Sequence, residues 1–232
     1  MVGAVTEPYY HDAEAGITIY CGDCRDVLPG LAADVLVTDP PYGIGAAWSR
    51  SEMVGSNGAS RLWGKGETWD DTPVDQSVVD LAIGTTDHAI VWGGNYYTLP
   101  PSRCWLIWDK VQAFSGADAE LAWTNLVLPV RVFRLSRIDA YVNRAESVKQ
   151  HPTEKPVSLM RWCLGLVPTA QTVLDPFMGS GTTLVAAKQL GRRAIGIEIE
   201  ERYCEIAAKR LAQGVLALGD DPPGSRDREE GT

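Results

Sequence analysis

A short apolar run that passes through a glycine-rich turn into a helical pattern limits this chain to few folds. Residues 172–174 form the apolar run, and the turn that follows contains Gly179 and Gly181. Helical spacing continues over 182–190, and a second apolar run at 193–197 comes directly behind it. A strand that enters a helix through such a turn, with another strand next in the chain, is typical of a parallel sheet covered by helices.

The same alternation extends over most of the chain. Apolar runs bounded by turn residues predict buried parallel strands, and helical spacing separates them. Strands are expected at 34–38, 89–92, 172–174 and 193–197. Helices are expected at 73–83, with Pro73 near the first turn, at 182–190 and at 200–212. The predicted fold class is α/β, with a mixed, mostly parallel sheet and helices on both faces.

Two stretches do not follow this alternation. Residues 43–71 are rich in Gly and Ser and too long for an ordinary connection, which predicts a functional loop. Residues 103–143 predict antiparallel strands and turns. The length suits one domain, expected at 1–218 with insertions near 43–71 and 111–150. The charged, Pro- and Gly-rich segment 219–232 predicts a disordered tail.

Composition excludes several classes of protein. The net charge of −9 argues against a surface covered with phosphate-binding side chains, although basic residues outnumber acidic ones over 131–161. No apolar run approaches the roughly 18 residues that span a bilayer, so a cytoplasmic protein without a membrane partner is expected. Of five cysteines, only Cys21 and Cys24 have metal-like spacing, and no second pair completes a zinc site. Reduced thiols and no metal are therefore expected.

The turn at 175–183, Asp-Pro-Phe-Met-Gly-Ser-Gly-Thr-Thr, has the composition of a ligand-binding turn. Glycines allow the backbone to approach a nucleoside-bearing ligand, and the helix N-terminus favours a negative group. Thr182 stands where a triphosphate-binding loop has Lys, and Leu184 stands where a dinucleotide fingerprint has Gly or Ala. Glu198, at a strand end, is placed to hold the ribose of either a dinucleotide or adenosylmethionine. A purely structural turn is the remaining alternative.

A second segment, Asp39-Pro40-Pro41-Tyr42, follows directly after the strand expected at 34–38. Two prolines fix φ and restrict the preceding residue, so they hold Asp39 and Tyr42 on stiff, extended backbone. Ligands of open parallel sheets bind outside the carboxyl ends of the strands, so this segment and the turn at 175–183 are expected to share one crevice. On its own, a Pro-Pro turn after a strand can be purely structural.

Together these segments resemble the DNA amino-methyltransferases, which act on adenine N6 or cytosine N4. Asp39 to Tyr42 is similar to the catalytic motif of that family, and 175–183 is similar to its cofactor loop. His-Pro-Thr-Glu-Lys-Pro at 151–156 is similar to the segment before that loop in the permuted, beta-class members. The resemblance covers roughly residues 15–213. It implies a Rossmann-like S-adenosylmethionine-dependent methyltransferase fold with circularly permuted motif order.

The resemblance also implies the site residues. The catalytic ones are Asp39, Pro40, Pro41 and Tyr42. The cofactor-binding ones are Asp23, Thr153, Lys155, Asp175, Phe177, Gly179, Ser180, Gly181, Thr182, Thr183 and Glu198. Among these, Glu198 is assigned to the ribose, Asp23 to the adenine, and Lys155 and Thr153 to the methionine end. For His151, a capping or packing role is the preferred interpretation.

These residue types suit methylation of an exocyclic amino group, whose nitrogen is a poor nucleophile because its lone pair is delocalised. Asp39 and the Pro40 carbonyl can each accept one N–H, which favours a pyramidal nitrogen aimed at the methyl group. The base has to leave the duplex, and Tyr42 offers a ring against which it can stack. Neither Cys21 nor Cys104 is expected to act as a nucleophile.

The predicted function is site-specific DNA adenine N6 methylation in a restriction-modification setting, since Ser at position 39 is commoner in cytosine N4 members of the family. The expected partners are DNA, the methyl donor and a second copy in a homodimer. Cytosine N4 methylation, RNA adenine methylation and a non-catalytic nucleic-acid- or cofactor-binding module are the alternatives. Target recognition is assigned to 43–71 and 111–150, where Arg131, Arg134, Arg137 and Asn143 can reach phosphates or base edges.

Overall fold

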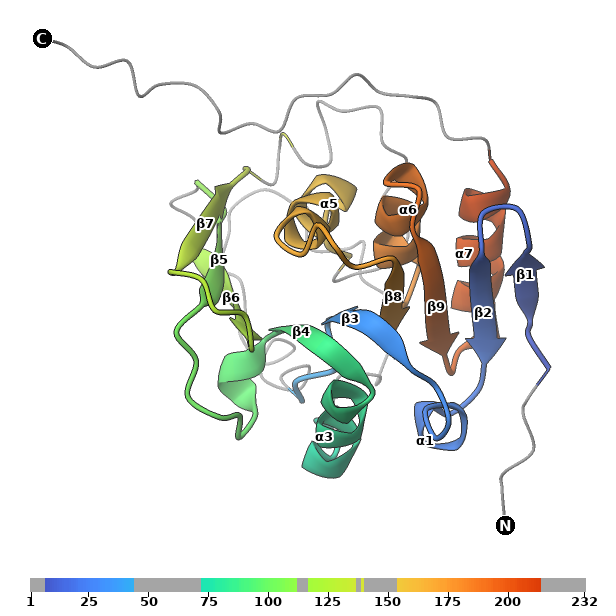
Figure 1. Cartoon of the computed structure of the whole chain (residues 1–232), viewed down its shortest axis with the longest axis horizontal. Helices are drawn as coiled ribbons and strands as arrows, with labels where there is room; N and C mark the ends of the chain where they lie inside the picture. Colours follow the sequence, from blue (N-terminus) through green and yellow to red (C-terminus); the bar gives the residue numbers. More distant parts are fainter. Residues whose placement is uncertain (1–6, 44–71, 112–116, 137–138, 140–153, 214–232) are drawn as a thin grey trace, which may run out of the picture.

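The computed structural model describes residues 7–43, 72–111, 117–136, 139 and 154–213 (Figure 1). These residues form one nine-stranded sheet with the strand order β1-β2-β9-β8-β3-β4-β6-β5-β7. Its strands are β1 (Tyr10–Asp12), β2 (Ile17–Cys21), β3 (Ala33–Thr38), β4 (Thr86–Trp92), β5 (Trp105–Asp109), β6 (Ala119–Thr124), β7 (Arg131–Arg134), β8 (Thr172–Asp175) and β9 (Arg193–Glu198). The helices are α1 (Cys24–Val27), α3 (Gln76–Gly84), α5 (Val157–Gly165), α6 (Thr182–Gln189) and α7 (Glu201–Ala212), with a 3-10 turn, η2, at Gly94–Tyr96.

The centre of the sheet is parallel. Strands β2, β9, β8, β3 and β4 pair in parallel, and so do β5 and β7. Within the described part of the chain, β1 and β6 are the strands that run against their neighbours. The mixed, mostly parallel sheet expected from the alternation of apolar runs and helices is thus confirmed.

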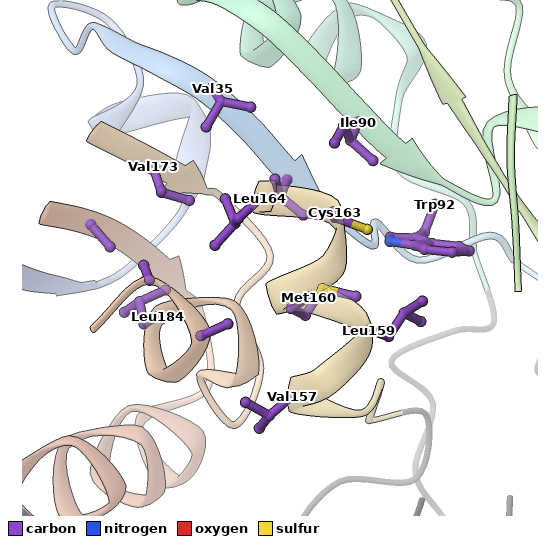
Figure 2. Close-up of a cluster of buried hydrophobic side chains, with 14 of the residues drawn as sticks. Val35, Ile90, Trp92, Val157, Leu159, Met160, Cys163, Leu164, Val173 and Leu184 are labelled. Atoms are coloured by element: carbon purple, nitrogen blue, oxygen red, sulfur yellow. The ribbon is translucent and has the colours of Figure 1, made fainter. Parts of the chain in front are cut away.

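Helices cover both faces of this sheet. In Figure 1, α5 and α6 lie above the sheet, whereas α1 and α3 lie below it. Successive side chains of a strand point to opposite faces, so Val35 and Val37 join the core under α5, α6 and α7, while Leu36 joins the core with α1 and α3. Figure 2 shows Leu164 of α5 on the first face, near Val173 and Val35, with Met160 further along the same helix. Burial on two faces explains why these strands are continuous apolar runs.

The C-terminal half of the chain supplies the middle of the sheet. Strands β8 and β9 lie between β2 and β3, and β8 pairs with β3 in the register Val35–Val173 and Leu36–Leu174. Parallel neighbours end at the same edge, so the chain segments that follow β3 and β8 leave the sheet side by side.

Several sequence-based boundaries need correction. The helix expected at 73–83 begins only at Gln76, because Asp75 caps it by accepting the Ser77 N–H at 2.8 Å. Pro73 instead forms a bridge with Tyr42. The antiparallel interpretation of 103–143 is right for β5 and β6, but β5 and β7 are parallel.

Other features were not indicated by the sequence pattern, or lie beyond the described residues. Helix α5 and strand β1 have no predicted counterpart. Strands β6 and β7 belong to the central sheet although they fall inside the insertion expected at 111–150. Residues 44–71 of the expected loop, and the tail at 219–232, lie outside the described residues.

Some general features of the described part bear on function. None of its helices combines the length and apolar character needed to cross a membrane. All five cysteines carry free thiols. In the ranges that the structure describes, no group of three or more His, Cys, Asp or Glu side chains is arranged to hold a metal ion.

The packing of α6 on β9 provides a test of the core. Leu184 is fully buried, and its methyl groups fill the space that a side chain at Gly196 would need. We expect Leu184→Ala to lower the free energy of unfolding by about 2–5 kcal/mol, because it leaves a cavity that rigid neighbours cannot close. Leu190→Ala, at the C-cap of the same helix, where the leucine is 36% exposed, should cost less than about 1 kcal/mol. Urea denaturation followed by circular dichroism measures both, and equal losses would contradict this account of the core.

Candidate active site

A cavity of about 450 Å³ opens where four parallel strands end. Residues after β2, β3, β8 and β9 line it, together with side chains from α3 and from the segment before α5. The strand-end residues include Asp23, Asp39, Asp175 and Glu198. This position, outside the carboxyl ends of adjacent parallel strands, is where α/β sheets bind ligands. The two segments singled out in the sequence therefore meet at one cavity.

Asp175 links the two segments at the cavity floor. Its buried Oδ1 accepts the Thr38 hydroxyl at 2.8 Å and the Phe177 N–H at 3.2 Å. Burial raises the pKa of Asp175 to about 6, although these hydrogen bonds and one from the Thr183 hydroxyl oppose it. The end of β3 and the turn after β8 are thereby held together by a side-chain bond as well as by the sheet.

The turn after β8 depends on glycine. Gly179 and Gly181 have φ of +52° and +80°, the left-handed region that side chains disfavour. A Cβ on Gly181 would also lie 2.7 Å from the Cβ of Ala207 on α7. The two glycines thus bring the first turn of α6 against α7 and leave its N-terminal N–H groups near the cavity.

Glu198 fixes the other side of this turn. Its Oε2 accepts the Gly179 N–H at 3.0 Å, and its Oε1 accepts the Glu200 N–H at 2.9 Å. Burial raises the pKa of Glu198, and these backbone bonds oppose the shift. The carboxylate is therefore held at the cavity wall, where its remaining lone pairs can accept hydrogen bonds from a ligand.

An ion pair between Arg210 and Glu154 holds the same turn from its other side. Arg210 on α7 donates to the carbonyl and the hydroxyl of Ser180, each at 2.9 Å, and pairs with Glu154 at 2.8 Å. Glu154 also accepts the Thr182 hydroxyl at 3.2 Å. The side chains of Arg210 and Glu154 are only 14% and 8% exposed. This ion pair connects α7, the turn after β8 and the segment before α5.

The turn after β3 is held by the backbone of its second proline. The Pro41 carbonyl accepts the Tyr97 hydroxyl at 2.6 Å and the Val74 N–H at 3.1 Å. Tyr42 bridges to Pro73 on the same side. These contacts anchor the turn to η2 and to the start of α3, so its stiffness does not come from the prolines alone.

Tyr42 points toward Asp39. Its hydroxyl donates to Asp39 Oδ1, and its ring stacks on Tyr96 with centroids 4.9 Å apart and an interplanar angle of 17°. Gly93 has φ of +65°, and a Cβ there would overlap the Tyr42 ring. Burial raises the pKa of Tyr42 well above its ordinary value, so the hydroxyl keeps its proton and remains a donor.

Four charged side chains form a series of ion pairs that begins with Asp39 and Lys155 at the cavity and continues to Glu120 on β6 and to Lys110. Lys155 Nζ lies 2.5 Å from Asp39 Oδ2 and 3.0 Å from Glu120 Oε2, and Lys110 Nζ lies 2.6 Å from Glu120 Oε1. Burial opposes the charged form of Lys155, but Asp39 and Glu120 outweigh it and raise its pKa. Burial likewise opposes charge on Glu120, yet the two lysines lower the pKa of Glu120 to about 2. Lys155 and Glu120 are therefore charged at neutral pH, and each lies between two groups of opposite formal charge.

Asp39 differs from Glu120 in its charge environment. Burial raises the pKa of Asp39 above its ordinary value, Lys155 opposes this shift and Glu120 adds to it. The carboxylate is 23% exposed and lines the cavity. It is therefore an anion held by a lysine at the cavity wall, with a basicity above that of an ordinary aspartate.

Most of the sequence-predicted site residues line the cavity. They are Asp23, Asp39, Pro41, Lys155, Asp175, Phe177, Gly179, Ser180, Thr182, Thr183 and Glu198. Pro40, Tyr42 and Gly181 are their neighbours but are not among the lining residues. Thr153 and His151 lie outside the described residues, as do Arg137 and Asn143. Arg131 and Arg134 are exposed on β7.

Two predicted residues have partners that the sequence did not indicate. Lys155 is predicted at the methionine end of a cofactor, and the structure places its ammonium on Asp39. Asp23 caps α1 by accepting the Arg25 N–H at 2.9 Å, and it also pairs with the Arg25 side chain. Glu120, Lys110 and Arg210 were missed because nothing local distinguishes them, whereas Glu154 lies in the segment 151–156 singled out in the sequence but had no role assigned to it. Gly93 could have been found, because it directly follows a buried parallel strand.

The cavity has an acidic wall. Its acidic residues are Asp23, Asp39, Asp75, Glu154, Asp175, Glu198 and Glu200, against the basic residues Arg25 and Lys155. Such a lining favours a ligand that carries positive charge. The N-terminal N–H groups of α6 add donors suited to a carboxylate on the same ligand.

Comparison with known proteins is consistent with this site. A family model described as DNA methylase matches residues 91–209, slightly more than half of the chain. The matched segment contains the turn after β8 and Glu198, and it begins after Asp39 to Tyr42. The type II methyltransferase M2.DpnII of Streptococcus pneumoniae is 54% identical over 63 residues, which are 27% of this chain and 24% of that protein. M2.MboI of Moraxella bovis is 25% identical across 88% of this chain and 90% of its own length.

Two solved structures share the fold. The M1.HpyAVI–SAM complex superimposes with a TM-score of 0.52 at 20% identity, over 84% of this chain and 98% of its own. The PvuII DNA methyltransferase, described as cytosine-N4-specific, has a TM-score of 0.54 at 15% identity over 89% of each chain. These likenesses confirm the predicted methyltransferase fold. With the family match, they show that this chain belongs to the N6/N4 DNA methylase family.

Proposed function

We propose that this protein transfers the methyl group of S-adenosylmethionine to the N6 amino group of adenine in DNA. The observation that carries the proposal is the shared cavity, in which Asp39 at the end of β3 lies beside the Asp175 turn at the end of the neighbouring strand β8. The end of β3 thus presents an acceptor for an amino group, and the end of β8 presents a turn suited to the methyl donor.

The cavity residues fit S-adenosylmethionine group by group. The Glu198 carboxylate is placed to accept the ribose hydroxyls, and Asp175 offers an anion to the ammonium group of the methionine moiety. The first turn of α6, at Thr182 and Thr183, offers backbone N–H donors to its carboxylate, and Phe177 offers an apolar ring to its adenine. The donor carries a sulfonium and one net positive charge, which matches the acidic lining. The proposal also assigns Asp23 to the adenine of the cofactor and Thr153 to its methionine end.

Asp39 is the group expected to act on the target nitrogen. Its carboxylate and the Pro40 carbonyl each accept one N–H of the amino group, which draws the nitrogen lone pair out of conjugation. The lone pair forms the new N–C bond while the S–C bond breaks and its electrons stay on sulfur. The surplus N–H proton then passes to Asp39, whose raised pKa favours acceptance, and from there to water.

Adenine is preferred over cytosine because position 39 is Asp. The PvuII enzyme shares the fold at 15% identity, and its stated cytosine specificity concerns that protein alone. We further propose that the substrate is DNA, that the target base is flipped out of the duplex, and that the protein forms a homodimer. Tyr42 is the proposed stacking partner of the flipped base, although in this structure its ring lies against Tyr96. Arg131 and Arg134, exposed on β7, are proposed phosphate contacts.

The role of Asp39 is tested by replacing it with alanine. Asp39→Ala should lower the rate of methyl transfer by about a thousandfold or more, because the amino group loses the acceptor that favours its pyramidal form. Cofactor affinity should change by less than about threefold. Labelled methyl transfer to unmodified DNA, with mass spectrometry of the released nucleosides, measures the rate and identifies the base.

The matched control for that experiment is Asp80→Asn, which alters an exposed carboxylate on α3 that is bonded to Gln76. It should transfer methyl groups at the wild-type rate. Full activity of Asp39→Ala would contradict the assigned role, and N4-methylcytosine or product in RNA alone would overturn the adenine or the DNA assignment.

The role proposed for Glu198 predicts a loss of cofactor affinity, whereas that of Asp39 predicts a loss of transfer rate. Glu198→Gln should raise the dissociation constant of S-adenosylmethionine about tenfold or more, because it weakens the acceptor for the ribose and the bond to Gly179. The rate at saturating cofactor should fall much less. Isothermal titration calorimetry gives the affinity, and Glu205→Gln, at an exposed position on α7, is the control. Unchanged affinity in Glu198→Gln would remove Glu198 from the cofactor site.

A further inference from the structure

Both oxygens of Asp39 already have donors. Oδ1 accepts the Tyr42 hydroxyl, and Oδ2 accepts Lys155 Nζ at 2.5 Å. Each oxygen has a further lone pair, but a substrate amino N–H that binds there shares the oxygen with the donor already present and so competes with that contact. The Tyr42 hydroxyl is a neutral donor, whereas the Lys155 ammonium is a buried charge that needs an anion wherever it lies.

Glu120 provides that second anion. Lys155 Nζ is already 3.0 Å from Glu120 Oε2, and an ammonium has three N–H donors, so it can strengthen this contact without travelling across the site. The rings of Tyr42 and Trp92, whose centroids lie 5.9 and 5.8 Å from Nζ, flank the ammonium. Glu120 comes from β6, which lies beside β4 and thus one strand further from β3.

Lys110 holds Glu120 in place from the opposite side. Its Nζ lies 2.6 Å from Oε1, so each oxygen of Glu120 faces a different lysine. Lys110 Nζ also lies 5.4 Å from the centroid of the Trp108 ring. The side chains of Lys110 and Lys155 are 6% and 7% exposed, so solvent screens these pairs weakly.

We propose that Glu120 is a positioning residue that shares Lys155 with Asp39 and retains it when Asp39 binds the substrate amino group. The proposal rests on the methyltransferase function proposed above. Lys110 supports it by keeping Glu120 ionised and oriented. The four side chains carry two positive and two negative charges, so the site stays neutral as Lys155 moves from Asp39 toward Glu120.

The proposal predicts that removing the charge of Glu120 and removing the charge of Lys110 shift the pKa of Asp39 in opposite directions. The charged or titratable groups that act on Asp39 or on its immediate partners are Lys155, Glu120, Tyr42, Lys110, Tyr97 and Asp175. Without the negative charge of Glu120, Lys155 interacts with Asp39 alone, which lowers the pKa of Asp39. Without the positive charge of Lys110, Glu120 attracts Lys155 more strongly, which raises the pKa of Asp39.

The test is a carbon-13 NMR titration of the Asp39 carboxyl carbon in the full chain without ligands, with the signal assigned from its loss in Asp39→Ala. Glu120→Gln should lower the titration midpoint by about one pH unit or more, and Lys110→Gln should raise it. Glu120→Asp, which retains the charge, should keep the midpoint near that of the wild type. This measurement needs no activity, so it stands apart from the proposed function.

The kinetic readout is the pH profile of methyl transfer at saturating cofactor. Glu120→Gln should lower kcat about tenfold or more and move the acid limb of the profile to lower pH, while the KM for S-adenosylmethionine changes by less than about threefold. Lys110→Gln should move the acid limb of the profile to higher pH. A residue that only packs the sheet would reduce activity or stability without opposite displacements of this limb.

The outcomes separate the two proposals. Midpoints that stay at the wild-type value in Glu120→Gln and Lys110→Gln, or that move in the same direction, overturn the role of Glu120. If Glu120→Gln does not fold, Lys110→Gln and Glu120→Asp decide the matter through the same titration. If the wild-type protein transfers no methyl group while the midpoints shift as expected, the sharing of Lys155 is supported and the proposed function fails.

Discussion

The parallel pairing of β3 with β8 is the contact on which the site depends. It joins residues that are 137 positions apart, such as Thr38 and Asp175, whose side chains are bonded at the cavity floor. Because both strands run in the same direction, the two loops that follow them leave the sheet at one edge. An antiparallel arrangement of the same two strands would have placed the acidic turn and the glycine turn at opposite ends of the molecule.

The parts of the site that could be predicted are those with a local signal. Buried parallel strands are continuous apolar runs, so Asp39, Asp175 and Glu198 could be recognised as the polar residues that end them. Parallel topology then places such ends together. The start of α3 was misplaced because Pro73 suits the first turn of a helix, whereas its contact with Tyr42 depends on tertiary structure.

Glu120 and Lys110 could not be predicted because their importance depends on the order of strands. Glu120 is one charged residue in a short strand, and its neighbours Ala119 and Leu121 give no indication of a charge cluster. Only the insertion of β6 between β4 and β5 brings it within 3.0 Å of Lys155. Loop conformation and strand order are properties of the whole fold, and they decide which charges meet.

The charges of the site also resolve an apparent conflict between composition and function. A chain with a net charge of −9 is poorly suited to non-specific attraction of DNA, but its acidic residues are not spread evenly. Seven of them line one cavity with two basic residues. An acidic cavity concentrates a cationic methyl donor, and the same field favours the positive charge that develops on an amino nitrogen as it is methylated. The acidic residues that disfavour non-specific binding of DNA therefore favour the methylation proposed for a DNA base.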